Sequence, residues 1–324
     1  MPHRRVLTTA FALAALATLA APATAQDWPG REPLRLIVCA PAGSTVDLTA
    51  RAWAEALKEA LAGHPVVVEP RAGAGGMIGV EAVARARPDG TTLLVCFPGS
   101  FTMIPHLRAN LPVRPLEDLR PAALLATAPF VVVAHPEAGR SLPEFLAKAR
   151  AADFSYASVG AGSLAHLGME LLKLRTGIRL EHVPYPGSPQ ALADLLAGRV
   201  AAFITLLSAV EGHVREGRLA PLFVTATERL PQLPAVPTAR EAGLPDLTVL
   251  TWHGLFAPRP TPEPVFARIV EAVAKARASP ALKEALARAG SDLPLLSPAE
   301  AEAFIRAESE TWGGVIRAAA IRID

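Results

Sequence analysis

Short apolar runs alternate with amphipathic stretches along the first third of the chain. Each run is followed by a loop rich in Gly or Pro, and then by apolar residues at helical spacing. The runs that fit buried strands are Leu34–Cys39, Val66–Glu69 and Thr91–Phe97. Because strands that alternate with helices pair in parallel, this pattern predicts an α/β fold whose sheet is covered by helices on both faces.

The same alternation starts afresh in the middle of the chain and gives way to helices at the end. The strand candidates there are Phe130–Ala134, Ser155–Ser158, Glu181–Tyr185, Val200–Thr205 and Leu219–Ala226. Three helices are predicted to start near Thr261, Pro280 and Ser297 and to pack back on the first sheet. The chain would then cross between two lobes near Leu125–Pro129 and near Thr248–Gly254.

We therefore predict two lobes with a cleft and a hinge between them. Lobe 1 comprises residues 26–126 plus 251–324, and lobe 2 comprises residues 127–250. Capping boxes that begin at Ser44, Ser141 and Ser297 support three of the predicted helix starts.

The first 25 residues have the pattern of a secretory signal peptide. A basic stretch over residues 3–5 precedes an apolar run from Val6 to Ala21, and Ala-Thr-Ala at residues 23–25 is a small-x-small cleavage site. A transmembrane anchor is the alternative, but the run is short for one and ends at the cleavage site rather than at a charged flank. We predict export to the periplasm and a mature chain that starts near Gln26.

Composition and motifs limit the kinds of partner that we expect, but they do not show whether the two cysteines are paired. Of 324 residues 51% are hydrophobic, and the formal net charge of +2 by itself neither favours nor excludes a polyanionic partner. We expect no nucleic-acid partner and no cofactor. We also expect no metal, since no CxxC or Cys/His cluster occurs. In an exported chain Cys39 and Cys96 could form a disulfide, or they could remain buried thiols that pack as small apolar residues.

Three loops share one design, since each follows a strand, consists of small residues and opens a helix. They are Ala42–Thr45, Gly73–Gly76 and Gly160–Ser163. Helix starts leave free N–H groups with partial positive charge, and glycine lets a ligand approach the backbone closely. We interpret the loops together as a site for a carboxylate or phosphate that needs no Lys or Arg. The alternative is that their Gly and Ser residues only form tight turns.

Two other functions fit these loops less well. The glycines of residues 73–79 resemble GxGxxG, but the last spacing is wrong and the loop follows the second strand rather than the first. Ser163 and His166 share a helix face, but no G-x-S-x-G elbow is present, so we predict no enzyme and no catalytic residue. Asp47 can complete the Ser44 cap, contact a polar group of a ligand, or do both.

Short motifs spread over the chain after residue 26 match those of a known family. They are WP at 28–29, PLRLIV at 33–38, PAGSTVD at 41–47, AR at 50–51, VVVE at 66–69, GAGG at 73–76, PDGTTLL at 88–94, YAS at 156–158, GS at 162–163, HL at 166–167, HVPY at 182–185, GS at 187–188, DL at 194–195, Gly198, PAVPT at 234–238 and EAGLP at 241–245. In combination they resemble the Bug family, the periplasmic receptors of tripartite tricarboxylate transporters. The resemblance implies two lobes of the type II periplasmic-binding-protein fold that close on a ligand in the cleft.

The resemblance also implies a ligand site and partners. The family holds one ligand carboxylate through backbone amides and ordered waters from both lobes. Carried over, the ligand-binding residues are Gly43, Ser44, Asp47, Gly73, Ala74, Gly75, Gly76 and Ser100 in lobe 1, and Ser158, Gly162, Ser163, His166, Pro184 and Tyr185 in lobe 2. The implied partners are a small organic carboxylate and the membrane permease subunits, and we expect a monomer. A sensing role beside a two-component system is the alternative that the sequence does not separate from transport.

Two departures from the family pattern bear on the ligand. The first loop is usually richer in Gly, where this chain has Ala42, Ser44 and Thr45. Residues 203–208 (FITLLS) lack the acidic or amide residue that the family often has near the cleft. Because the ammonium group of an amino acid needs such an acceptor, we expect a less polar carboxylate.

Overall fold

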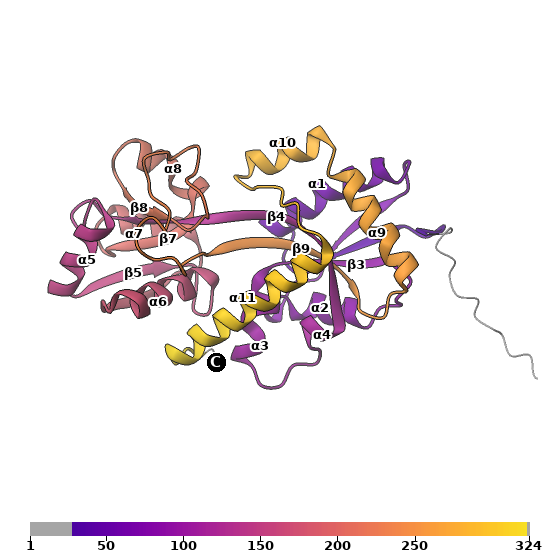
Figure 1. The fold of residues 1–324 in the computed structure, drawn as a ribbon, viewed down its shortest axis with the longest axis horizontal. Helices are drawn as coiled ribbons and strands as arrows, with labels where there is room; N and C mark the ends of the chain where they lie inside the picture. Colours follow the sequence, from indigo (N-terminus) through magenta and orange to yellow (C-terminus); the bar gives the residue numbers. More distant parts are fainter. Residues whose placement is uncertain (1–27, 323–324) are drawn as a thin grey trace, which may run out of the picture.

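The computed structural model describes residues 28–322, in which helices and strands alternate as predicted (Figure 1). In chain order the elements are β1 (Leu34–Val38), α1 (Thr45–Ala60), β2 (Val66–Pro70), α2 (Met77–Ala84), β3 (Thr92–Cys96), α3 (Ile104–Leu107), α4 (Pro115–Asp118), β4 (Leu119–Ala134), α5 (Leu142–Ala151), β5 (Phe154–Ser158), α6 (Leu164–Thr176), β6 (Leu180–Pro184), α7 (Ser188–Leu196), β7 (Ala202–Leu206), α8 (Leu207–Arg215), β8 (Ala220–Val224), β9 (Leu250–Pro258), α9 (Glu263–Ala276), α10 (Pro280–Arg288) and α11 (Pro298–Ala318). A 3₁₀ turn over Ala74–Gly76 precedes α2, and a π-helical turn over Gly99–Met103 precedes α3. The predicted signal peptide lies outside the described residues. Within residues 28–322, no helix has the length and apolar character that crossing a bilayer requires.

One mixed sheet runs through the molecule in the order β2-β1-β3-β9-β4-β7-β5-β6, with β8 paired to β4 off this order. β1 is parallel to β2 and β3, and β5 is parallel to β6 and β7, which confirms the predicted parallel pairing in the outer parts of the sheet. β9 is antiparallel to β3 and β4, and β4 is antiparallel to β7 and β8. The prediction of parallel pairing is therefore wrong for the central strands.

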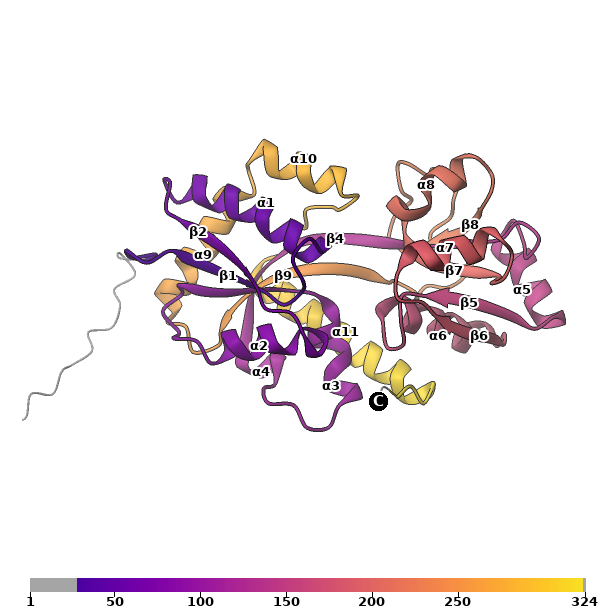
Figure 2. The same cartoon turned by 180° about the vertical axis from the view of Figure 1, so that it is seen from behind.

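The long strands β4 and β9 join the two halves of the molecule and run side by side between them (Figures 1 and 2). Their antiparallel register extends from Leu119 opposite Pro258 to Pro129 opposite Leu250. The predicted crossing points fall mainly on these strands, of which only the part Phe130–Ala134 was predicted as a strand. We propose that the lobes divide along this pair, with the boundaries at residues 126/127 and 250/251.

The strand character of β4 was hidden by its composition. Its 16 residues are almost all buried, so they lack the alternation that marks a half-exposed strand. Proline also argues against a central strand, because it cannot donate to the ladder. Here the register shifts between Pro121 and Ala123 and between Leu124 and Ala126. Such irregularities are where a sheet tolerates a proline.

Helices cover both faces of the sheet in each half. In lobe 1, α1, α9 and α10 pack on one face around Trp53, and α2 and α11 pack on the other around Phe256. The C-terminal helices were predicted to pack back on the first sheet, and α9, α10 and α11 do so. α11 also packs against α6, because Trp312 and Ile316 belong to the same core as Leu167. This helix therefore contacts both lobes.

Cys39 and Cys96 form a disulfide with their Cα atoms 5.3 Å apart. Their positions follow from the β1–β3 register, in which Val38 pairs with Val95. The start of α2 lies directly against the bond, since a Cβ on Gly79 would lie 2.9 Å from Cys39 Cα. Of the two alternatives that the sequence left open, the structure has the paired form.

Replacing both cysteines (C39S/C96S) should lower the free energy of unfolding by about 2–4 kcal/mol, because the bond restricts the unfolded chain. Denaturant unfolding without reductant measures the change. Reductant should weaken the native protein by a similar amount and leave the double variant unaffected. Two free thiols in unfolded, unreduced native protein would contradict the pairing.

Glu308 on α11 is a partly buried acid beside the crossing strand β9. Trp252 Nε1 on β9 donates to Glu308 Oε2 at 2.5 Å, and Trp252 is 1% exposed. Burial raises the pKa of Glu308 to about 7, although the bond from Trp252 acts in the opposite direction. A carboxyl group whose pKa lies near neutrality therefore links the C-terminal helix to the crossing strand.

The raised pKa of Glu308 predicts a pH dependence of stability. Between the ordinary value of 4.5 and about 7 the folded state binds more protons than the unfolded state, so stability falls as the pH rises through this window. E308Q keeps an acceptor for Trp252 and cannot ionise. It should exceed the native protein in stability at pH 8 by about 1–3 kcal/mol, with the difference closing towards pH 5. Melting curves at both pH values measure this, and parallel pH profiles of the two proteins would contradict it.

Candidate functional site

The loops singled out in the sequence lie at the carboxyl ends of parallel strands. In lobe 1, Val38 pairs with both Pro70 and Val95, so the loops after β1, β2 and β3 leave the sheet at one edge. In lobe 2, Ser158 pairs with Pro184, so the loops after β5 and β6 also leave together. Each lobe thus collects its predicted site residues at the edge where open α/β sheets bind ligands.

The start of α1 is held by Ser44 and Asp47. Ser44 Oγ accepts from Asp47 N at 3.3 Å, which confirms the cap. The second bond of the predicted capping box is absent from the described chain, because the Asp47 side chain accepts from Gly43 N and not from Ser44 N. Asp47 Oδ2 accepts from Gly43 N and from Arg51 Nε, both at 2.9 Å. Burial alone would raise the pKa of Asp47, but the bonds from Arg51 and Gly43 outweigh it and hold the pKa below its ordinary value. Asp47 Oδ1 is buried without a hydrogen-bond partner in the described chain, so it remains available as an acceptor.

The Gly73–Gly76 loop is packed against the disulfide. Gly76 has a φ of 94°, and a Cβ there would collide with Ser100 Oγ and lie 3.2 Å from Cys39 Sγ. Only glycine fits this approach. Ser100 is fully buried and donates from Oγ to Gly75 O at 2.8 Å, so it holds the loop in place.

The start of α6 repeats the design of α1. Ser163 Oγ accepts from His166 N at 3.2 Å and donates to Gly160 O at 2.7 Å. His166 Nδ1 accepts from Gly162 N at 3.0 Å, so the neutral ring has its proton on Nε2. The Ser163 hydroxyl is therefore not paired with the His166 ring, and the two do not form a nucleophile and base.

Stacked aromatic rings pack against the start of α6. The His166 and His182 ring centroids are 3.9 Å apart with planes at 8°, and Tyr156 follows 5.0 Å from His182. Tyr156 Oη and Lys173 Nζ both donate to Glu170 Oε1, at 2.7 and 2.8 Å. Burial lowers the pKa of His166, and burial with the neighbouring His166 lowers the pKa of His182 to about 4. Both rings are therefore neutral at neutral pH, which preserves the acceptor role of His166.

The remaining predicted residues of lobe 2 make contacts within that lobe. Ser158 Oγ lies 2.6 Å from His182 Nε2 and accepts from Gly160 N at 3.2 Å. Tyr185 Oη donates to Asp194 Oδ2 at 2.7 Å, and burial together with this bond raises the pKa of Tyr185 to about 12. Pro184 is exposed. The two hydroxyl groups are thus committed to neighbours.

In the described chain, the backbone amides that lack an acceptor at the two helix starts belong to residues just after the predicted glycines, and not to those glycines themselves. Gly43 N and Gly162 N are already used, as described above. The open donors at α1 belong to Thr45 and Val46, and those at α6 to Leu164 and Ala165. First-turn amides have no acceptor within their helix, and they lie at the positive end of its dipole. Each lobe therefore offers a pair of N–H donors to an anion.

A cavity of about 390 Å³ lies between the lobes. Three predicted residues line it together, namely Gly75 from lobe 1 and Gly162 and Ser163 from lobe 2. Its other lining residues are Phe97, Gly99, Met103, Ile104, Leu107, Arg108, Ala161 and Leu164. The predicted residues outside its lining are Gly43, Ser44, Asp47, Gly73, Ala74, Gly76, Ser100, Ser158, His166, Pro184 and Tyr185.

Within the segment 97–108, which forms a wall of this cavity, only Ser100 was predicted as a site residue, and Ser100 is not one of its lining residues. The apolar residues of the segment resemble ordinary core, and Met103 and Ile104 are indeed buried. The π-helical turn that shapes the wall has no simple periodicity. The one available signal was position, because the segment follows β3 at the edge shared with the two glycine loops. Among the described residues, no group of three or more His, Cys, Asp or Glu side chains is arranged to hold a metal ion.

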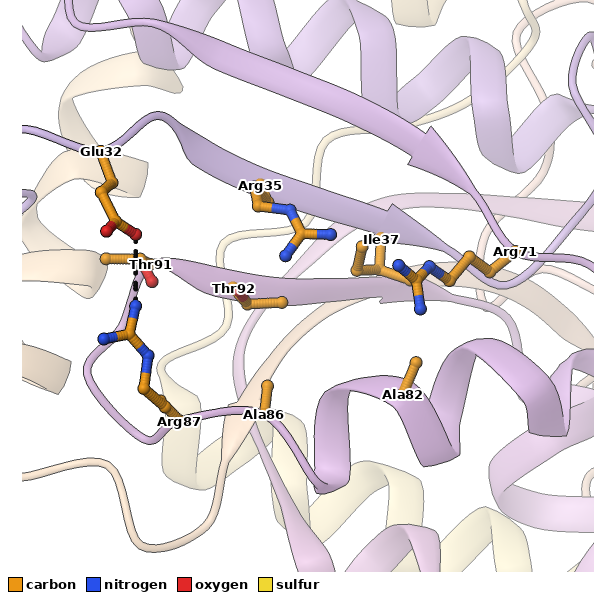
Figure 3. Close-up of a pocket in the computed structure, with 9 residues that line it drawn as sticks. All are labelled: Glu32, Arg35, Ile37, Arg71, Ala82, Ala86, Arg87, Thr91 and Thr92. Atoms are coloured by element: carbon orange, nitrogen blue, oxygen red, sulfur yellow. Dashed lines mark hydrogen bonds and ion pairs between the residues drawn. The ribbon is translucent and has the colours of Figure 1, made fainter.

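A second cavity, of about 240 Å³, lies on lobe 1 and is lined by Arg35, Arg71 and Arg87 (Figure 3). Its charges are balanced by neighbours. Arg35 donates to both oxygens of Glu69, at 2.6 and 2.8 Å, and Arg87 lies 3.2 Å from Glu32. Arg71 is 3.8 Å from Glu69. Because each cation has an acidic partner, we assign no ligand to this cavity.

Comparisons with known proteins identify the family of the chain. Residues 49–321 match the sequence model described as the tripartite tricarboxylate transporter family receptor. Protein BugT of Bordetella pertussis is 37% identical over 321 residues, which cover 98% of each chain.

Solved structures show the same fold. MatC from Rhodopseudomonas palustris, solved with bound malate, is 32% identical with a TM-score of 0.70, covering 88% of this chain and 98% of that one. A second R. palustris protein, solved with adipate, is 31% identical with a TM-score of 0.75, covering 91% and 99%. The resemblance drawn from the sequence motifs is confirmed: the chain belongs to the tripartite tricarboxylate transporter receptor family and has the α/β fold of its periplasmic binding proteins.

Proposed function

We propose that this protein captures a small organic carboxylate in the periplasm and delivers it to the membrane subunits of a tripartite tricarboxylate-type transporter. The observation that supports this most is the pair of open amides at each of two helix starts, α1 and α6. The malate and adipate bound by two structural relatives are small carboxylates as well. The protein acts in this proposal as a receptor and not as an enzyme.

The ligand's carboxylate is bound by backbone and its body by apolar side chains. Leu164 N and Ala165 N donate to one carboxylate, while Phe97, Met103 and Leu107 contact the hydrocarbon part. Closure of the lobes along β4 and β9 brings the start of α1 to the same ligand and excludes water. Excluding water strengthens each amide contact, since hydrogen bonds to a charged group contribute about 1.5–3 kcal/mol.

Export and delivery complete the proposal. The signal peptide at residues 1–25 directs the chain to the periplasm and is removed, which leaves a monomeric receptor. The closed, ligand-bound form differs in surface from the open form, and this difference lets the permease subunits recognise loaded receptor.

A screen of organic acids should raise the melting temperature of the purified protein. An acid at a hundred times its Kd adds about 2.7 kcal/mol to stability, because it binds the folded state alone. Aliphatic acids should give larger shifts than amino acids, whose ammonium group finds no acidic lining residue in this cavity. Thermal shift measurement of the melting temperature, with neutral sugars as controls, tests this expectation. A shift with a sugar and none with any acid would refute carboxylate binding.

The amide at Leu164 can be removed without losing the helix. Leu164 is the first residue of α6, a position that accepts proline, and Ser163 before it has φ −71° and ψ 158°, as a residue before proline requires. L164P lacks the donor, whereas the control L164A loses the same side chain and keeps the donor. L164P should bind the best acid about tenfold or more weakly than L164A. Calorimetry measures both, and equal affinities would show that this amide does not bind the ligand.

The matching pair at α1 is T45P and T45A. Ser44 has φ −68° and ψ 163°, so proline fits after it, and the Thr45 side chain is exposed. If closure brings α1 to the ligand, T45P should also bind about tenfold or more weakly than T45A. Equal binding by this pair would restrict the amide site to lobe 2.

A further inference from the structure

Arg108 places a positive charge in the lining of the interlobe cavity without an acidic partner. It follows α3 in an extended conformation, with φ −129° and ψ 124°, and its N–H donates to Ile104 O at 3.0 Å, which fixes the base of the side chain. The side chain is exposed and has no ion pair or hydrogen bond within the described chain. The arginines of the other lobe 1 cavity contrast with it, since each has an acidic neighbour.

The cavity has two different features for anions. Arg108 is the single charged residue in its described lining, and it comes from lobe 1. The open amides at the start of α6 come from lobe 2. Between them lie apolar side chains, including Phe97, Met103 and Leu107. A ligand that fills this space thus meets a backbone anion site, an apolar wall and a guanidinium group.

We propose that Arg108 is a specificity residue that binds a second carboxylate of the ligand, while the start of α6 binds the first. This inference rests on the proposed carboxylate receptor and specifies its ligand as a dicarboxylate with an apolar chain. A guanidinium group suits the role because its planar fork donates two parallel hydrogen bonds to one carboxylate. Closure of the lobes removes water from this pair and raises its contribution.

The apolar wall restricts the chain that joins the two carboxylates. The side chains of the lining other than Arg108 and Ser163 have no hydrogen-bonding group apart from the weak Met103 sulfur, and the Ser163 hydroxyl already donates to Gly160 O. A hydroxyl on the ligand chain would therefore be desolvated without a side-chain partner. Unsubstituted aliphatic diacids should consequently bind more tightly than hydroxylated diacids of the same length.

Calorimetric titration of R108Q tests the inference with ligand pairs that differ by one charge. Each diacid from succinate to adipate is compared with its own monomethyl ester, which keeps the length and removes one carboxylate. R108Q should bind the best diacid about tenfold or more weakly than the native protein does. It should bind the monoester of that diacid with an affinity within about twofold of the native protein's. Its melting temperature without ligand should equal that of the native protein, because the Arg108 side chain is exposed and has no hydrogen bond or ion pair within the described chain.

R114Q is the matched control. Arg114 is the next arginine along the chain, is exposed, and does not line the cavity. The R114Q substitution removes the same formal charge from the same lobe, so any loss of affinity in it measures the long-range attraction of anions. Both ligands should bind R114Q within about twofold of the native protein.

The outcomes separate this inference from the function on which it rests. If the native protein binds the acids and R108Q loses no more diacid affinity than R114Q, then the role of Arg108 is overturned while the carboxylate receptor stands. An equal loss of diacid and monoester in R108Q also overturns that role, since the residue would then not distinguish the second carboxylate. Native protein that binds no acid in the series overturns the carboxylate receptor itself.

Discussion

The antiparallel pairing of β4 with β9 is the constraint on which the rest of the structure depends. Each strand belongs to the central sheet and continues from one half of the molecule to the other, so the two lobes share one hydrogen-bonded ladder. The parallel strands on either side then direct their carboxyl ends, and the loops that follow, to defined edges. α11 adds a second connection, since it packs against α6 and accepts a hydrogen bond from Trp252 on β9 at Glu308.

In the loops before α1 and α6, side chains fix the backbone and backbone amides are left open to bind a ligand. Asp47 and His166 each accept the N–H of a preceding glycine, and Ser44 and Ser163 cap the helices that follow. These bonds hold the helix starts rigidly, while the next two amides stay open. In the proposed receptor, the residues that resemble a catalytic set therefore prepare the backbone to bind an anion. The neutral state of the two stacked histidines is part of that preparation, because a protonated His166 ring could not accept from Gly162.

The sequence was sufficient for the local pattern and insufficient for contacts between distant segments. Caps such as Ser44 and Ser297 depend on neighbours three residues away, so they could be predicted and are confirmed. The β4–β9 pair joins residues more than a hundred positions apart, and its buried, proline-containing strands give no alternation. The disulfide, the approach of Gly76 to Ser100 and the position of Arg108 in the cavity likewise follow from tertiary packing. No motif in the sequence records these.

The proposed function depends above all on the binding of the ligand's carboxylate by backbone amides at helix starts. A crystal structure with the acid that raises the melting temperature most tests it directly. Carboxylate oxygens should lie about 2.7–3.1 Å from the amide nitrogens at the starts of α6 and α1, between closed lobes. A carboxylate bound only by side chains, or bound away from both helix starts, would rule out this mode of binding.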